Sequence, residues 1–318
     1  YPWSVQKNGR NVFGELRALL NLAAIIRRFR PKIFFGYTIK PVAYGLILSR
    51  LLGVPRRVGM ITGLGYAFLP GSGLKRALVR AVAQIAYWIA LRQADAVIFQ
   101  NRDDLELFRQ RQLLPIGTEV AVVNGSGVDL NAFPQAPLPP GPPVFLMVAR
   151  LLVDKGVHEF VEAARIVRAA VPKARFILVG AGDTNPEAVP QSTVETWVAE
   201  GVIEAPGHVD DPAAYYAACH VFVLPSYREG TPRTNLEAMA TGRAIITTDV
   251  AGCRETVEDG ISGLLVVPRD PSSLASAMLK LAVHPTLVSA MGKAGRKLCE
   301  ERFEVSRVTA ATAAIVMS

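Results

Sequence analysis

Two carboxylates, Glu229 and Glu237, lie eight positions apart in a segment that joins a predicted strand to a predicted helix. Gly230 and Pro232 end the strand, and the helix is expected to begin near Thr234. In an open parallel sheet this is the carboxyl edge, where ligands bind. The first N–H groups of a helix favour an anion, and carboxylates accept hydrogen bonds from hydroxyl groups. The segment therefore predicts a site for a phosphate attached to polyols, such as a nucleotide-sugar.

Two cations, Arg150 and Lys155, follow an apolar run at residues 144–148 that predicts another buried strand. Arginine can bind a diphosphate through two parallel hydrogen bonds, and lysine acts as a mobile point charge. Together they can offset the negative charge that grows on a leaving nucleoside diphosphate, which stabilises the transition state. We therefore predict that Arg150 and Lys155 are catalytic residues.

The backbone between the two carboxylates is predicted to hold the diphosphate through its N–H groups, except at Pro232, which has none. The residues concerned are Thr231, Pro232, Arg233, Thr234 and Asn235. A pair of carboxylates is also typical of glycoside hydrolysis. Hydrolysis would leave the diphosphate-binding features unexplained, so we favour binding of a nucleotide-sugar.

Gly180 and Gly182 follow a further predicted strand but lack the third glycine of a dinucleotide fingerprint. We interpret them as a tight turn beside a nucleotide base. His208 is expected to order its loop rather than to catalyse. The cysteines and histidines show no metal-ligand spacing, and Asp210-Asp211 is not an Asp-x-Asp motif, so we predict no divalent metal and no cofactor.

Several motifs in chain order resemble the retaining glycosyltransferases of the GT-B fold, in family 4. Residues 229–237 resemble the family's Glu-x7-Glu signature, residues 150–156 its Arg-x4-Lys-Gly motif, and residues 124–129 its Asn-Gly-Ser-Gly-Val-Asp turn. Residues 38–41 and 62–68 resemble a bacterial subgroup that adds N-acetylhexosamines, such as N-acetylgalactosamine, to lipid-linked sugars. Residues 252–257 resemble part of the same subgroup's pattern.

This resemblance implies roles and a reaction. Glu237 would bind ribose and Glu229 would face the sugar as a catalytic residue. Residues on the acceptor side would be Tyr37, Thr38, Lys40, Thr62 and Gly63. The reaction would move a hexosamine or hexose from a UDP-sugar to a polyprenyl-diphosphate-linked acceptor in surface polysaccharide or glycan biosynthesis. The leaving diphosphate would accept the acceptor's proton, so no side-chain base is demanded.

The charge is unevenly distributed along the chain. Residues 1–118 hold 18 Lys and Arg against 5 Asp and Glu, a balance of +13, whereas the remainder balances at −5. A basic half implies an acidic partner, which could be nucleic acid, an anionic bilayer or a lipid diphosphate. No nucleic-acid-binding module is apparent. Residues 74–92 predict an amphipathic helix that could lie on a membrane surface, although packing into its own domain is the commoner meaning.

These patterns predict a peripheral protein on the cytoplasmic face of the cell membrane. The three cysteines, Cys219, Cys253 and Cys299, form no close pair, which fits a reducing compartment. The longest uncharged apolar stretch, residues 81–91, is shorter than the roughly 20 residues that a spanning helix needs.

Short apolar strands alternate with helices, which predicts parallel sheets covered on both faces. The expected architecture is GT-B: two Rossmann-like, doubly wound α/β domains facing across a cleft. We expect an acceptor-side domain at residues 1–133, a proline-rich linker at 134–143, a nucleotide-sugar domain at 144–304, and a last helix at 305–317 that returns to the first domain.

The first domain is expected to be incomplete, because the strand and glycine-rich loop with which the family usually begins are not found. A chain without them is expected to bind the nucleotide but to transfer sugar poorly. Two alternatives therefore stay open. The chain could be a truncated, inactive nucleotide-binding relative, or a nucleotide-sugar epimerase of the same fold.

Overall fold

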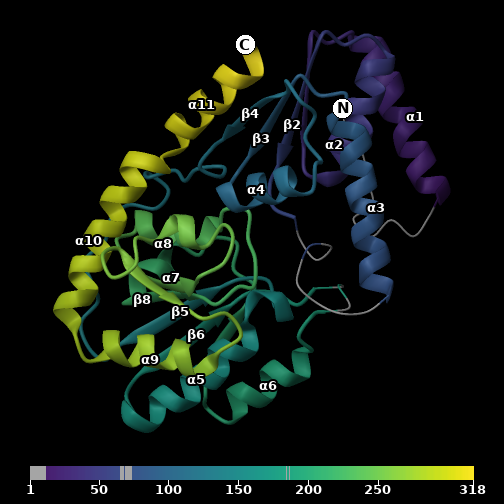
Figure 1. The fold of residues 1–318 in the computed structure, drawn as a ribbon. Helices are drawn as coiled ribbons and strands as arrows, with labels where there is room; N and C mark the ends of the chain where they lie inside the picture. The colour runs from purple at the N-terminus through teal and green to yellow at the C-terminus, as the bar shows by residue number, and fades with distance from the viewer. Residues whose placement is uncertain (1–11, 65–67, 69–73, 184, 186) are drawn as a thin grey trace. The chain divides into compact units, whose positions relative to one another are not determined.

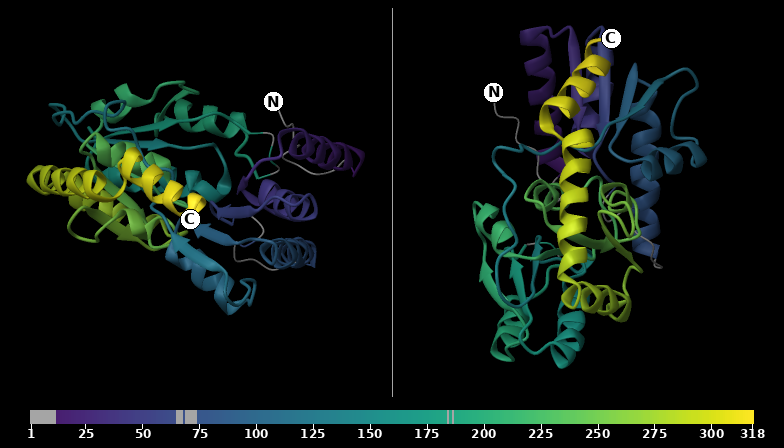
Figure 2. Two further views of the ribbon diagram at one scale, coloured as in Figure 1. Left: turned by 90° about the horizontal axis from the view of Figure 1, so that it is seen from above. Right: turned by 90° about the vertical axis from the view of Figure 1, so that its left-hand side faces the viewer.

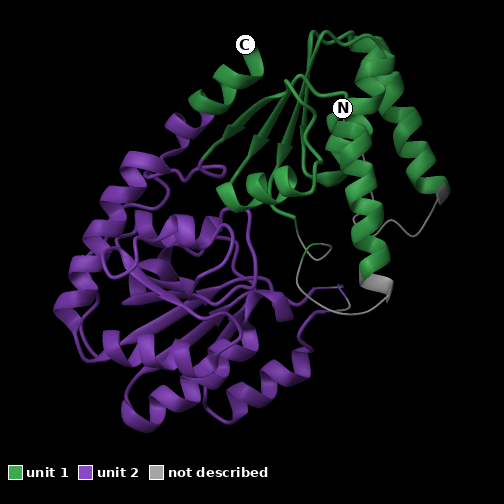
Figure 3. Cartoon of the chain, in the orientation of Figure 1, with its two compact units in different colours: residues 1–123, 310–318 green, residues 124–309 purple. Residues whose placement is uncertain are grey.

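The computed structural model describes residues 12–64, 68, 74–183, 185 and 187–318, with the side chains of residues 12 and 74–76 left aside. The chain divides into two compact units, residues 1–123 with 310–318 (unit 1) and residues 124–309 (unit 2) (Figure 3). The central residues of the predicted motif at 62–68, Gly65 to Ala67, lie outside the described part.

Unit 1 contains a parallel sheet whose strand order, among the described residues, follows the chain: β1-β2-β3-β4 (Figure 1). These strands are β1 (Ile33–Tyr37), β2 (Arg56–Ile61), β3 (Ala96–Phe99) and β4 (Glu119–Val122). The helices that connect them are α2 (Ile39–Leu51), α3 (Leu74–Leu91) and α4 (Arg102–Gln110), preceded by α1 (Val12–Phe29). All four strands therefore end at one edge of the sheet.

Side chains alternate between the two faces of this sheet, as the pleat of a strand requires. Val97 and Phe99 of β3 pack with α2, α3 and α4 in one apolar cluster. Ala96 and Ile98 face the other way and pack near Ile315 and Val316 of α11 (Val305–Met317). The last helix therefore contributes apolar side chains to unit 1, so the unit's sheet is covered on both faces.

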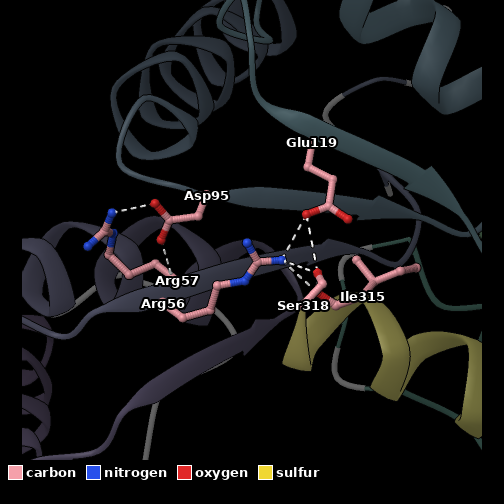
Figure 4. Close-up of polar contacts among 6 residues, drawn as sticks. All are labelled: Arg56, Arg57, Asp95, Glu119, Ile315 and Ser318. Atoms are coloured by element: carbon pink, nitrogen blue, oxygen red, sulfur yellow. Dashed lines mark hydrogen bonds and ion pairs between the residues drawn. The ribbon is translucent and has the colours of Figure 1, made fainter.

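Two arginines at the start of β2 are held inside unit 1 (Figure 4). Arg57 is 8% exposed and donates to both carboxylate oxygens of Asp95 through its backbone N–H and its guanidinium. Arg56 donates to Glu119, 2.8 Å away, and to the carbonyl of Ile315, 2.7 Å away. Both belong to the excess of cations in residues 1–118 from which an acidic partner was expected. Their charges are instead paired within the unit, with carboxylates at the starts of β3 and β4.

Unit 2 contains a parallel sheet with the order β10-β9-β8-β5-β6-β7. The strands are β5 (Val144–Val148), β6 (Arg175–Val179), β7 (Glu204–Gly207), β8 (Val221–Leu224), β9 (Ala244–Thr248) and β10 (Gly263–Val266). The order runs outward from β5 to β7 and, in the opposite direction, from β8 to β10. This reversal between β5 and β8 is the switch point of a doubly wound sheet.

Two pairs of helices pack against each other around this sheet. α5 (Val157–Ala170) packs against α9 (Pro271–Ala282), and α8 (Arg233–Ala240) packs against α10 (Pro285–Arg302) (Figures 1 and 2). The shorter helices are α6 (Gln191–Ala199) and α7 (Ala213–Ala218). One apolar cluster joins these helices to both sides of the sheet. It buries the central strands β8 and β9 completely, which explains their apolar runs, whereas the edge strand β7 is partly exposed.

Among the described helices, none alone is long and apolar enough to cross a membrane. α9 and α10 meet the length and composition criteria only as a pair, bent by 103° at the break between them.

The division between the units falls between Val123 and Asn124, about ten residues before the predicted linker. The proline-rich segment belongs to unit 2, where Phe133 is buried in the core and the Ala136 N–H donates to the Thr241 carbonyl. The fully buried Arg243 donates to the carbonyls of Ala136, Pro137, Cys219 and Thr241. It therefore ties the segment to the domain.

The helix and strand bounds predicted above lie within two residues of the observed ones. α2 begins at Ile39, so Pro41 falls in its first turn, where a proline is tolerated. β7, at Glu204–Gly207, contains Pro206, a residue that is unusual within a strand. Two short 3-10 helices, at Val153–Lys155 and Arg254–Thr256, were not predicted.

We predict that Arg243→Ala destabilises the protein by about 3 kcal/mol, because several buried carbonyls lose their donor. Arg175→Ala is the matched control, since Arg175 forms a half-exposed pair with Glu204, and such pairs contribute about 0–1 kcal/mol. Urea unfolding measures the loss, and limited proteolysis should show faster cleavage at residues 134–143 in Arg243→Ala alone. Equal effects of the two changes would contradict the role of Arg243.

Candidate active site

The switch point of unit 2 brings together the two segments predicted to hold a diphosphate. β5 pairs directly with β8, with Phe145 opposite Val221 and Leu146 opposite Phe222. Arg150 and Lys155 follow β5, and the segment from Glu229 to Glu237 follows β8. Because parallel strands end at the same edge, these segments are neighbours although more than seventy residues separate them. A switch point is the place where ligands bind in such sheets.

Lys155 and Glu229 form a close ion pair in this crevice. Lys155 Nζ lies 2.5 Å from Glu229 Oε1, and the two side chains are 16% and 15% exposed. Gly156 makes the approach possible, because it has φ +74° and any Cβ there would lie 2.2 Å from the Pro225 carbonyl oxygen. The loop after β5 can therefore lie directly against the loop after β8.

Burial acts to lower the pKa of Lys155, but attraction to the Glu229 carboxylate and their hydrogen bond outweigh it and raise the pKa. Burial also raises the pKa of the neighbouring Asp154 carboxyl, with Lys155 opposing the shift and Glu229 adding to it. Lys155 is therefore held as a cation at neutral pH. A buried cation whose partner is a single carboxylate is suited to an arriving anion.

Arg150 lies at the exposed side of the same group. Its side chain is 62% exposed, and its guanidinium lies 3.1 Å from Asp183, on the loop after β6. Gly180, at the end of β6, allows a close approach, because a Cβ there would lie 1.9 Å from the Ala149 carbonyl oxygen. A Cβ at Gly182 would meet nothing within 4 Å. The structure therefore gives a packing reason for Gly180 and none for Gly182.

α8 begins at Arg233 with Pro232 at its N-cap position and no side-chain cap. The N–H groups of Arg233 and Thr234 lie in the first turn, where a helix has no internal acceptor for them. The N–H of Asn235 donates to the Pro232 carbonyl at 3.1 Å, and its buried side chain donates to Thr256. The side chain of Asn235 therefore joins α8 to the loop after β9, and the role of its backbone at a diphosphate stays a prediction.

Glu237 is 7% exposed and both of its carboxylate oxygens have partners. The Tyr216 hydroxyl donates to Oε2 at 2.8 Å, and Arg233 Nε lies 3.0 Å from Oε1. Burial raises the pKa of Glu237, while both partners favour its charged form. The buried Tyr216 on α7 therefore orients the carboxylate that was predicted to bind ribose.

The predicted acceptor-side residues lie in unit 1. Tyr37 ends β1, Thr38 is the N-cap residue of α2, and Thr62 and Gly63 follow β2, so all lie at the carboxyl edge of that sheet. Thr38 and Gly63 both have positive φ, 70° and 111°. These residues form a second group of candidate residues, which belongs to unit 1.

Lys40 is the best defined member of this second group. Its Nζ lies 2.6 Å from Glu15 Oε1 on α1, and the Tyr44 hydroxyl donates to Glu15 Oε2 at 2.8 Å. The hydrogen bond from Lys40, followed by that from Tyr44, lowers the pKa of Glu15. Burial and Glu15 raise the pKa of Tyr44 to about 12. Lys40 therefore also joins α1 to α2.

Three residues that hydrogen-bond to the candidate residues of unit 2 were not predicted: Tyr216, Ser226 and Asp183. Tyr216 gave no signal, because a tyrosine in a short helix reads as a core residue. Ser226 and Asp183 could have been found, because each lies within a few residues of the end of a strand, at the same edge as a candidate residue. In the described part of the chain no three His, Cys, Asp or Glu side chains gather to hold a metal. Independence of metal stays a prediction.

Comparison with known proteins shows the class of fold. A family model described as "glycosyl transferases group 1" matches residues 142–284, and one described as "glycosyl transferase 4-like" matches residues 2–101. The chain is similar to sucrose-phosphate synthase from Thermosynechococcus elongatus, with a TM-score of 0.81 and 22% identity over 98% of this chain and 80% of that one. Anabaena HepE, solved with UDP and glucose, has a TM-score of 0.76 and 18% identity over 97% and 83%. The fold is therefore GT-B.

Two curated relatives are similar to most of this chain. The N,N'-diacetylbacillosaminyl-diphospho-undecaprenol alpha-1,3-N-acetylgalactosaminyltransferase of Campylobacter jejuni is 29% identical over 83% of this chain and 71% of its own length. An Escherichia coli UDP-Gal:alpha-D-GlcNAc-diphosphoundecaprenol alpha-1,3-galactosyltransferase is 25% identical over 84% and 70%. The chain belongs to the GT-B glycosyltransferases of family 4.

We predict that Glu229→Gln moves the alkaline loss of UDP binding to lower pH. In the wild type the Glu229 carboxylate and its hydrogen bond raise the pKa of Lys155, so the ammonium charge that attracts the diphosphate is lost only as pH rises through this raised pKa. Without the carboxylate, burial dominates and the pKa of Lys155 falls. Calorimetric titration with UDP between neutral and strongly alkaline pH measures the midpoint. Glu204→Gln is the control, and an unchanged midpoint in Glu229→Gln would refute the coupling.

Proposed function

We propose that this protein is a retaining, metal-independent glycosyltransferase. It moves a hexosamine or hexose from a UDP-sugar to a polyprenyl-diphosphate-linked acceptor in surface polysaccharide or glycan biosynthesis. The observation that carries the proposal is the convergence of Arg150, Lys155, Glu229 and the start of α8 at one switch point. The named activities of the Campylobacter and Escherichia relatives, both on diphosphate-linked acceptors, support the choice of acceptor.

The roles follow from chemistry and position. Lys155 and Arg150 attract the diphosphate, and the N–H groups of Arg233 and Thr234 add partial positive charge at the start of α8. Glu237 accepts hydrogen bonds from the ribose hydroxyl groups, and Glu229 faces the sugar. As the glycosidic bond breaks, charge grows on the diphosphate, and the preorganised cations are most effective at that moment. The leaving diphosphate takes the acceptor's proton, so the reaction asks for no side-chain base.

The decisive experiment measures donor binding and transfer together. We expect UDP to bind, Glu237→Ala to weaken that binding, and Glu204→Ala to leave it unchanged. With a radiolabelled UDP-sugar and a polyprenyl-diphosphate-linked acceptor, Lys155→Ala should lower kcat on the order of a hundredfold, the loss of roughly 3 kcal/mol of transition-state stabilisation. Both measurements are made on the same preparation of the chain.

Three outcomes would contradict the proposal or its details. UDP-sugar binding without transfer favours a nucleotide-binding module. Interconversion of the UDP-sugar without an acceptor favours an epimerase. If Lys155→Ala raises KM and leaves kcat unchanged, Lys155 binds ground state and transition state equally, and its proposed catalytic role is wrong.

We also propose that unit 1 binds an anionic membrane surface through α3. The face of this helix with Ala83, Tyr87 and Leu91 is buried in the unit. A second apolar stripe at helical spacing is exposed: Leu78, Val82, Ile85 and Ile89 are 65%, 59%, 59% and 42% exposed. Trp88 is 47% exposed, and Arg92 stacks on its ring at 3.6 Å. A helix with two apolar faces has one face left for a partner.

The positive charge of the first 118 residues favours an anionic bilayer as this partner. The first 118 residues keep a balance of +13, and Arg27, Arg28 and Arg30 at the end of α1 are exposed. Tryptophan and arginine beside aliphatic side chains suit the headgroup region, where one end of a side chain is apolar and the other is wet. The expected location is therefore the inner face of the cell membrane, where anionic lipids and lipid-diphosphate acceptors occur together.

We predict that changing Leu78, Val82 and Ile85 to Ser lowers binding to vesicles of phosphatidylcholine and phosphatidylglycerol at least about tenfold, since three apolar side chains no longer leave water. The matched control changes Ile261, Val267 and Val283 of unit 2, which are 61%, 58% and 60% exposed. Co-sedimentation measures both, and binding should fall as salt rises. Equal binding to pure phosphatidylcholine would refute the electrostatic part, and a concentration-dependent dimer would indicate a second copy of the chain as the partner.

A further inference from the structure

One oxygen of Glu229 accepts hydrogen bonds from two different side chains. Lys155 Nζ lies 2.5 Å from Oε1, and the Ser226 hydroxyl donates to the same oxygen at 2.8 Å. Among the described residues no donor reaches the other oxygen, Oε2, so Oε2 can receive a hydroxyl hydrogen from a sugar. The orientation of Glu229 depends on both donors, and the two donors differ in charge.

Ser226 is fixed more firmly than a surface serine. It is fully buried, directly after β8, and its carbonyl accepts a hydrogen bond from the Thr248 hydroxyl of β9. Its own hydroxyl has two further acceptors nearby, the carbonyls of Asp154 at 3.2 Å and Arg228 at 3.5 Å. A hydroxyl has one hydrogen, and the charged oxygen of Glu229 is the nearest and strongest of these acceptors.

The two donors respond differently to an arriving nucleotide-sugar. Lys155 carries a charge that the diphosphate also attracts, so its hold on Glu229 weakens as the donor binds. The neutral hydroxyl of Ser226 is not drawn away by an anion. We infer that Ser226 is a positioning residue that keeps Glu229 oriented toward the sugar while Lys155 turns its charge to the diphosphate. This inference rests on the proposed function.

If Ser226 acts only through Glu229, the loss of its hydroxyl has effects that a general structural defect would not have. Loss of the hydroxyl should leave the binding of UDP, which lacks a sugar, within about twofold of the wild type. It should weaken UDP-sugar binding relative to UDP and lower kcat about tenfold, as expected for the loss of a hydrogen bond to a charged group. A structural defect would instead weaken UDP and UDP-sugar alike.

The experiment compares Ser226→Ala, Glu229→Ala and the double variant in the full chain. UDP and UDP-sugar binding are measured by calorimetry, and turnover is measured by release of UDP. In the Glu229→Ala background, Ser226→Ala should have less than about a twofold further effect, because the partner is gone. Thr247→Val is the matched control, since it removes a buried hydroxyl that donates to Leu224 on the same pair of strands without touching Glu229.

If Ser226→Ala does not fold, Ser226→Cys replaces it, because a thiol has similar volume and is a weak donor. Multiplicative effects of Ser226→Ala and Glu229→Ala, or a kcat for Ser226→Ala equal to that of Thr247→Val, would overturn the inference. Absence of UDP-sugar turnover in the wild type would instead overturn the proposed function. The two failures are therefore distinguishable.

Discussion

Hydrogen bonding between β5 and β8 places two loops side by side that the chain itself keeps far apart. The chain builds one half of the sheet from β5 to β7 and then returns to the other side of β5 with β8, which brings β5 and β8 together. Everything that makes unit 2 a candidate active site depends on it. Without this pairing, Lys155 and Glu229 would be isolated charges on separate loops, and α8 would begin at an edge with no cation opposite.

Burial then sets the chemistry of these loops. Lys155, Glu229 and Glu237 are each largely removed from water, and each is held by hydrogen bonds from neighbours. A buried charge is costly unless it is paired and hydrogen-bonded, so the residues that supply partners are as necessary to the site as the charges themselves. Tyr216 and Ser226 are such residues. Both are fully buried, and each donates a hydrogen bond to one of the carboxylates.

The sequence predicted that Arg150, Lys155 and the segment from Glu229 to Glu237 share one edge of a sheet, because they follow predicted strands and parallel strands end at the same edge. It did not predict the partners of other polar side chains. Arg56 and Arg57 contribute to the positive balance of residues 1–118, but their partners Glu119 and Asp95 lie across the sheet. The side chain of Asn235 has its partner Thr256 on another loop. In each case the sequence shows a polar side chain without showing which segment faces it.

The sequence by itself determined the alternation of strands and helices, the glycine at position 156, and the candidate charges at 150, 155, 229 and 237. These depend on local propensity, periodicity and spacing, which act over a few residues. Only the tertiary structure decided that Lys155 meets Glu229, that Tyr216 holds Glu237, and that Arg243 ties the proline-rich segment to unit 2. Such contacts depend on strand order and on the packing of distant segments, which no short stretch of sequence specifies.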